Sequence, residues 1–158
     1  MAKANSRNTR NSGDHLVLRS DVAQAKQSKL PDLNDVVIVE DETFDAKRLS
    51  AILNLVIGRQ ATLRIAQSMN EAIDAVLQSP PDLMFLDDYL EPSDLALDTI
   101  PMVRRVGYRG PIVVISGELD RERLVELKKA GASGAVHKDE LNSVDLGAML
   151  VRIFEGQK

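Results

Sequence analysis

The feature that most constrains the fold is a regular alternation of short apolar runs with amphipathic segments. Residues 36–39, 83–86 and 112–115 are continuous apolar runs, which are typical of strands buried on both faces. Two weaker strands are predicted around residues 63–65 and 135–136. After each strand, apolar residues recur at three- and four-residue spacing, which predicts a helix. Five such units in succession indicate an α/β fold with a parallel sheet and helices on both faces.

The unequal apolar content of the strands predicts their order in the sheet. Central strands of a parallel sheet are the most buried, so the second and fifth strands belong at the edges. The order 2-1-3-4-5 meets this condition and describes a doubly wound, five-stranded, flavodoxin-like sheet. In that order the topological switch, where ligands bind beyond the carboxyl ends of the strands, lies between strands one and three.

Helix boundaries follow from capping residues and turn formers. Thr43 is predicted to cap the first helix, and Gly58 lies where that helix should end. Residues 91–98 are expected to form an acidic loop, after which Asp98 or Thr99 caps the third helix. Pro101 would then lie in the first turn of that helix, where proline is tolerated.

Charge divides the chain near residue 31. Residues 1–34 hold six Lys and Arg and three Asp, a net charge of +3, whereas residues 35–158 hold 14 basic and 21 acidic residues, a net charge of −7. We therefore expect a polar, slightly basic arm at 1–34 and one folded domain at 35–158. A mobile tail and a docking or dimerising arm both remain open for the first segment.

Composition argues against several functional classes. The chain has no Cys, so disulfides and cysteine metal sites are excluded. Aromatic residues make up 3% and the net charge is −4, which argues against a nucleic-acid partner. No apolar run approaches the ~18 residues of a membrane span, and the N-terminus lacks a secretory signal. A cytoplasmic protein without a membrane partner is the expectation.

Charged and hydroxyl side chains follow four of the predicted strands directly. Glu40 and Asp41 come after the first strand, Asp87 ends the third, Ser116 ends the fourth and Lys138 follows the fifth. Carboxylates crowded at one edge of a sheet repel one another unless they share a proton or bind a cation, and Mg²⁺ suits oxygen ligands. Lys138 calls for an anion, and a phosphoryl group fits. The pattern suggests Asp87 as a nucleophile that accepts a phosphoryl group.

These residues lie in motifs that resemble the receiver domain of bacterial two-component response regulators. The motifs are DVVIVEDE, DLMFLDD, PIVVISG and GASGAVHK, and the resemblance covers about residues 35–156. The spacing of 29 residues from Asp87 to Ser116 and of 22 residues from there to Lys138 is also similar to that of the family.

The resemblance implies a role for each matching position. Asp87 would be the phosphoacceptor, Ser116 the switch hydroxyl and Lys138 the phosphate-binding lysine. Mg²⁺ would be bound by Asp41 and Asp87 directly, by Glu40 through water, and by the backbone carbonyl of Tyr89. Tyr89 and Glu118 flank the phosphoryl position and would tune its lifetime. Asp88, a further tuning candidate, is expected mainly as a solvent-facing or loop residue.

The chain departs from the family pattern near the fifth strand and after the acceptor. Ala135 stands where many receivers carry the Tyr or Phe that swings inward on phosphorylation, which puts that route of output in doubt. Asp139 follows Lys138 where proline is usual, so a different local turn is expected, and Glu91 also replaces a usual proline.

We interpret the chain as a single-domain response regulator, since it ends at Lys158 without a following output module. It would accept a phosphoryl group from a sensor histidine kinase or a histidine phosphotransfer protein and signal through a downstream protein partner, with a homodimer left open. It would be no enzyme beyond supporting its own phosphotransfer and autodephosphorylation. The alternatives are a phosphorylation-independent adaptor and an Mg²⁺-dependent phosphatase. The second is disfavoured because Tyr89 replaces the second aspartate of the DxD motif expected there.

Overall fold

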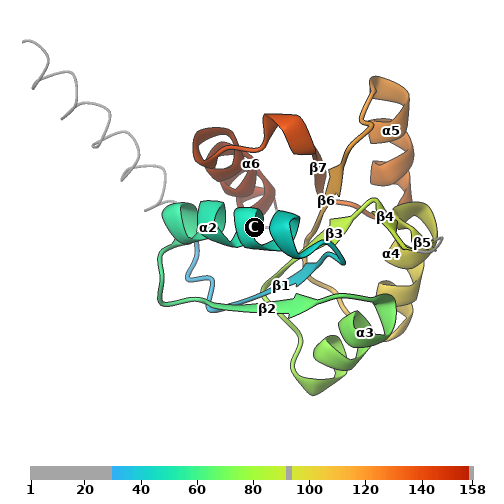
Figure 1. Ribbon diagram of the computed structural model, residues 1–158, viewed down its shortest axis with the longest axis horizontal. Helices are drawn as coiled ribbons and strands as arrows, with labels where there is room; N and C mark the ends of the chain where they lie inside the picture. Colours follow the sequence, from blue (N-terminus) through green and yellow to red (C-terminus); the bar gives the residue numbers. More distant parts are fainter. Residues whose placement is uncertain (1–29, 92–93, 157–158) are drawn as a thin grey trace, which may run out of the picture.

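The computed structural model describes residues 30–91 and 94–156, and its centre is a five-stranded parallel sheet (Figure 1). The order β2-β1-β3-β6-β7 confirms the predicted order 2-1-3-4-5, because β6 and β7 are the fourth and fifth strands of this sheet. Its strands are β1 (Asp35–Val39), β2 (Thr62–Ala66), β3 (Leu83–Asp87), β6 (Ile112–Ser116) and β7 (Gly134–His137).

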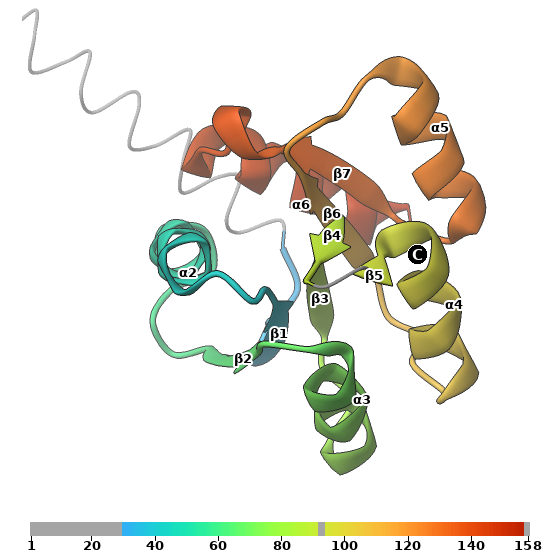
Figure 2. The ribbon, with the colours of Figure 1, turned by 45° about the vertical axis from the view of Figure 1, so that its right-hand side comes forward.

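Helices cover both faces of the sheet, as Figure 2 shows. The helices are α2 (Thr43–Ile57), α3 (Met69–Gln78), α4 (Ala96–Arg105), α5 (Arg121–Ala130) and α6 (Ser143–Glu155), with a short 3₁₀ turn at Lys138–Glu140. Helices α2 and α6 pack on one face, and α3, α4 and α5 pack on the other. The predicted doubly wound α/β architecture is therefore confirmed.

Alternation along each buried strand divides the core into two layers. On β1, Val37 and Val39 face the side of α3, α4 and α5, whereas Val36 and Ile38 face α2 and α6. The inner strands β3 and β6 are buried at every position, as their continuous apolar runs predicted. The edge strand β2 keeps only Ala66 fully buried.

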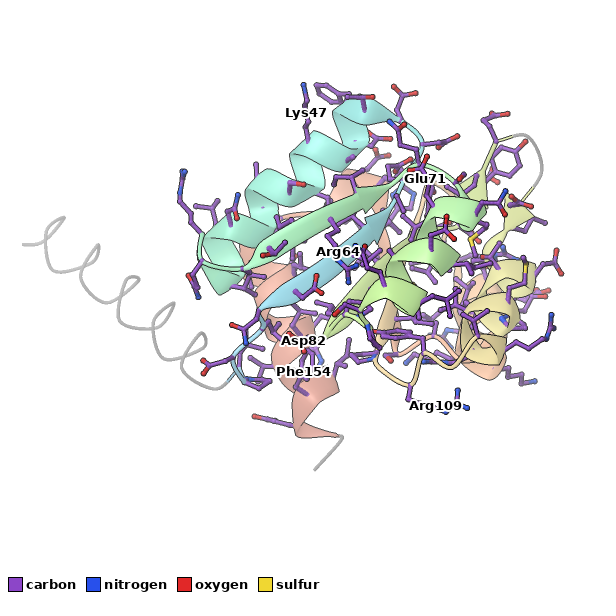
Figure 3. The ribbon with its side chains drawn as sticks, turned by 90° about the horizontal axis from the view of Figure 1, so that it is seen from below. Lys47, Arg64, Glu71, Asp82, Arg109 and Phe154 are labelled. Carbon is purple, nitrogen blue, oxygen red and sulfur yellow. The ribbon has the colours of Figure 1, made fainter. Side chains whose placement is uncertain are left out.

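The edge of the sheet at β2 carries a charged side chain that is held in place. Arg64 binds both carboxylate oxygens of Asp35, at 2.9 and 2.7 Å, and donates to the backbone carbonyl of Ala75 at 2.9 Å. Figure 3 shows Arg64 on this edge and Lys47 pointing away from the sheet on α2. Charged residues of this kind protect an edge strand against pairing with another chain.

Three boundary predictions were wrong, for local reasons. Helix α2 begins at Thr43 itself, with Glu42 at the N-cap position. The expected loop at 91–98 includes part of an antiparallel pair, β4 (Tyr89–Leu90) with β5 (Asp94–Leu95), and α4 already begins at Ala96. Thr99 is consequently buried inside α4, and Pro101 lies in its middle.

The expected arm lies almost wholly outside the described residues. Of residues 1–34, only 30–34 are described, and Leu33 is buried against the layer under α2 and α6. Within the described ranges, no helix has the length and hydropathy that a membrane crossing requires.

Candidate functional site at the carboxyl ends of the strands

Three carboxylates meet at the predicted switch point between β1 and β3. Asp87 is the last residue of β3, and Glu40 and Asp41 follow β1 directly. Oxygen atoms of all three side chains lie within 4.8 Å of one another. Glu40 and Asp87 are only 5% and 6% exposed, so their charges are poorly solvated. The structure therefore brings together the three side chains that were predicted as metal ligands.

Backbone amides of the surrounding loops hold the carboxylates in position. The amide of Glu42 donates to Glu40 Oε2 at 3.1 Å, and the amide of Glu91 donates to Asp41 Oδ2 at 3.0 Å. The amide of Tyr89 donates to Asp87 Oδ1 at 3.4 Å. Amides from the segments that follow β1 and β3 thus orient all three carboxylates. The donation from Glu91 also uses an amide hydrogen that proline would lack.

Burial and crowding give the cluster an affinity for a proton or a cation. Burial raises the pKa of Glu40 to about 8, and the hydrogen bond and negative charge of Asp87 act in the same direction. Burial also raises the pKa of Asp87, although the hydrogen bond with Glu40 and the charge of Lys138 oppose this. We infer that the pair retains one proton that a divalent cation would displace. The oxygen donors fit Mg²⁺, which is bound in proteins by one or two carboxylates and water.

Lys138 lies beside the cluster, with its Nζ 3.6 Å from Asp87 Oδ1 and 3.6 Å from Glu40 Oε1. Its closest carboxylate is Asp45 on α2, at 3.2 Å. Burial lowers the pKa of Lys138, but the charges of Asp87, Glu40 and Asp45 outweigh burial and raise it. The ammonium group therefore stays charged and lies where it could neutralise an anion bound to Asp87.

Two residues that support Lys138 were missed in the sequence. Arg48 on α2 donates to the backbone carbonyl of Lys138 at 3.0 Å and so fastens the turn after β7 to this helix. Asp45 and Arg48 lie about one turn apart in α2, and Asp45 is in the first turn, close in sequence to Glu40 and Asp41. The closeness of Asp45 to Glu40 and Asp41 in the sequence could have pointed to Asp45 as a site residue. The contact of Arg48 could not be predicted in this way, because it depends on how α2 packs against the turn after β7.

Ser116 is buried at the end of β6, and its hydroxyl group is hydrogen-bonded to Asp88 and Glu118 rather than to Asp87. Its Oγ donates to Asp88 Oδ2 at 2.8 Å or to the carbonyl of Glu118 at 2.9 Å, and it accepts from the amide of Glu118 at 3.1 Å. Asp88 is 8% exposed and also binds Arg123 of α5. The expectation that Asp88 faces solvent was therefore wrong, since it lies between two polar partners.

An open groove of about 970 Å³ runs beside Asp87 and gives solutes access to it. Asp87, Ser116, Glu118 and Lys138 line this groove, together with the exposed Tyr89. Both Tyr89 and Glu118 thus line the groove beside Asp87. Their role in tuning the lifetime of a phosphoryl group stays a prediction.

The two departures near β7 have visible consequences. Ala135 is buried in the layer under α5, and its methyl side chain has no second rotamer to switch between. The amide of Asp139 donates to His137 Nδ1 at 3.0 Å, a bond that proline could not make. The 3₁₀ turn that follows β7 is therefore held by a hydrogen bond that requires a residue other than proline at position 139.

Comparison with known proteins identifies the class of protein that this fold and site define. The family model "Response regulator receiver domain" matches residues 36–150. The chain therefore belongs to the response regulator receiver domain family, whose members act in two-component signalling and are typically phosphoacceptors rather than enzymes.

Solved structures show the same fold at low sequence identity. A two-component response regulator from Clostridium difficile is 20% identical, with a TM-score of 0.68, over 79% of this chain and 98% of that one. The N-terminal domain of a response regulator/sensory box/GGDEF three-domain protein from Carboxydothermus hydrogenoformans is 24% identical, with a TM-score of 0.64, over 78% and 98%. Among curated protein sequences, none matches this chain significantly.

Proposed function

We propose that this protein is a response regulator that accepts a phosphoryl group on Asp87. The observation that carries the proposal is the convergence of Glu40, Asp41 and Asp87 beside Lys138 at one edge of the sheet, where Asp87 and Lys138 line an open groove. Membership of the receiver family supports it independently of that geometry. We further propose that residues 35–158 form the receiver unit and residues 1–34 a separate arm. The start of the family match at residue 36 supports this boundary.

The proposed transfer needs little beyond positioning and charge. A carboxylate oxygen of Asp87 attacks phosphorus while the bond from phosphorus to the donor breaks, which leaves an acyl phosphate on Asp87. Lys138 neutralises charge on the transferred oxygens, and Arg48 and Asp45 hold it near the acceptor. Ser116 supplies a hydroxyl donor once it turns from Asp88. Water entering the same groove would later hydrolyse the acyl phosphate.

A divalent metal is part of the proposal. Asp41 and Asp87 would bind Mg²⁺ directly, while Glu40 would act through water and Tyr89 would contribute its backbone carbonyl. When bound, Mg²⁺ supplies positive charge that offsets the phosphoryl oxygens and the crowded carboxylates. The proton shared by Glu40 and Asp87 would leave as the metal binds.

Receiver domains work with a kinase, and we propose a phosphohistidine protein as the physiological donor, either a sensor histidine kinase or a histidine phosphotransfer protein. The phosphorylated state would then signal by protein–protein contact. The open groove at Asp87 suits a phosphorylated side chain presented by a docked protein.

Intact mass spectrometry tests the proposal directly. The full chain is incubated with Mg²⁺ and acetyl phosphate, and the wild type should gain one phosphoryl group while Asp87→Asn gains none. Asp74→Asn is the matched control, because it removes an exposed carboxylate on α3 without touching the site. The proposal fails if the wild type gains no phosphoryl group with either acetyl phosphate or a phosphohistidine donor. Steady turnover of a small phosphoester without an adduct would indicate a phosphatase instead.

A further inference from the structure

Asp88 joins the phosphoacceptor region to α5 through two sets of hydrogen bonds. Arg123 Nη2 donates to Asp88 Oδ1 at 2.6 Å, and Arg123 Nε donates to Asp88 Oδ2 at 3.1 Å, a two-point pairing of guanidinium with carboxylate. The same Oδ2 accepts from Ser116 Oγ at 2.8 Å. Asp88 and Ser116 are both buried, and Arg123 lines the groove beside Asp87. We call Asp88, Ser116 and Arg123 the latch.

The Ser116 hydroxyl cannot serve the latch and a phosphoryl group at once. A hydroxyl has a single proton to donate. In this structure that proton is shared between Asp88 Oδ2 and the carbonyl of Glu118. A phosphoryl oxygen on the neighbouring Asp87 would be a stronger, doubly charged acceptor for the same proton. Donation to the phosphoryl group therefore removes one of the donors that stabilise the Asp88 carboxylate.

Phosphorylation also weakens the remaining half of the latch. A phosphoryl group on Asp87 places negative charge next to Asp88, which repels it, and offers Arg123 an alternative acceptor in the same groove. The hydrogen bonds that Arg123 donates to Asp88 are the main cause that raises the pKa of Arg123.

Besides the latch, helix α5 is fastened mainly by Leu127, with Leu124 and Ala130 partly buried against the core. Among its residues only Leu127 is fully buried, whereas α4 buries Ala96, Thr99, Ile100 and Val103. Figure 2 shows α5 at the margin of the molecule, joined to β6 by residues 117–120. Arg123 lies in the first turn of α5, where Asp120 caps the helix by accepting from its amide. The latch thus holds the end of α5 that is nearest to the acceptor.

We propose that Asp88 is a positioning residue that holds Ser116 and Arg123 in the unphosphorylated protein, and that phosphorylation of Asp87 opens this latch and loosens residues 117–124. The inference rests on the proposed function. It gives the chain a direct route from the acceptor to α5 that needs no aromatic side chain at the position of Ala135.

Hydrogen–deuterium exchange of the full chain, read by mass spectrometry, tests the latch. Peptides covering residues 117–127 are followed in Mg²⁺ alone and after phosphorylation with acetyl phosphate. In the wild type, phosphorylation should raise their exchange about tenfold, the effect expected when hydrogen bonds to a charged group are lost. In Arg123→Gln the exchange should already be raised about tenfold without phosphate, with less than about a twofold further rise. Arg121→Gln, an exposed neighbour on α5, should behave as the wild type does.

The rise on phosphorylation separates a switch from a merely structural ion pair. A latch that only stabilises α5 would leave the phosphorylation-dependent rise in Arg123→Gln as large as in the wild type, and that result would overturn the inference. So would a wild type whose residues 117–127 exchange equally in both states.

Intact mass is measured on the same samples, so absence of a phosphoryl group would instead identify failure of the proposed function, and the switching step would fall with it. Peptides from β1 and β3 report folding, and Arg123→Lys, which keeps the charge but loses the two-point pairing, replaces Arg123→Gln if these peptides lose protection.

Discussion

Raising the pH from 5 to 8 without divalent metal is expected to destabilise this protein, because Glu40 holds a proton in the folded state. Its pKa rises from 4.5 to about 8 on burial beside Asp87. Between these values the folded state binds more protons than the unfolded state, so the free energy of unfolding falls as the pH rises. The advantage is fully present below pH 4.5 and is lost progressively up to about pH 8. At 1.36 kcal/mol for each pKa unit, the loss from pH 5 to pH 8 is about 3–4 kcal/mol.

Urea denaturation in EDTA measures this loss, and far-ultraviolet circular dichroism is the suitable signal because the chain has no Trp. Glu40→Gln cannot ionise, so its unfolding free energy should change by less than about 1 kcal/mol over the same range. Glu42→Gln is the control, since Glu42 is exposed and two residues away. Its curve should follow that of the wild type. A wild-type stability that is flat or rises from pH 5 to pH 8 would refute the shared proton.

Two further predictions concern the metal and the lysine. Excess Mg²⁺ should raise the melting temperature of the wild type at pH 8 more than at pH 6, because metal displaces a proton. Asp41→Asn should abolish the rise, and an equal rise in that variant would exclude Asp41 as a ligand. Lys138→Gln should slow phosphorylation by acetyl phosphate about 10²-fold or more while the Mg²⁺-induced stabilisation remains, and an unchanged rate of phosphorylation, measured by intact mass, would remove Lys138 from the transfer.

The order of the sheet could be predicted because burial on two faces demands a continuous apolar strand. Residues 83–86 and 112–115 meet that demand, and both occupy inner strands. Once the order is known, the position of Asp87 beside Glu40 follows, since the carboxyl ends of parallel strands lie at the same edge. The predicted cluster of carboxylates thus followed from topology rather than from any single motif.

The environment of Asp88 could not be predicted in the same way. Two consecutive aspartates at the end of a strand do not reveal which side chain turns toward which neighbour. The partner of Asp88 is 35 residues further along the chain, on α5, and the choice depends on how that helix packs. The start of α4 was missed for a related reason, because the pairing of Tyr89–Leu90 with Asp94–Leu95 shortens the loop before it. Contacts between distant segments decide both features.

The adjacency of Asp87 and Asp88 makes the site of phosphorylation the most direct test of the account. Phosphorylated protein is treated with borohydride, which reduces an acyl phosphate on aspartate to homoserine, and the peptide that contains both residues is sequenced by tandem mass spectrometry. The account predicts homoserine at position 87 alone, only after incubation with Mg²⁺ and a phosphodonor. Homoserine at position 88, or at neither position in protein that has gained a phosphoryl group, would contradict it.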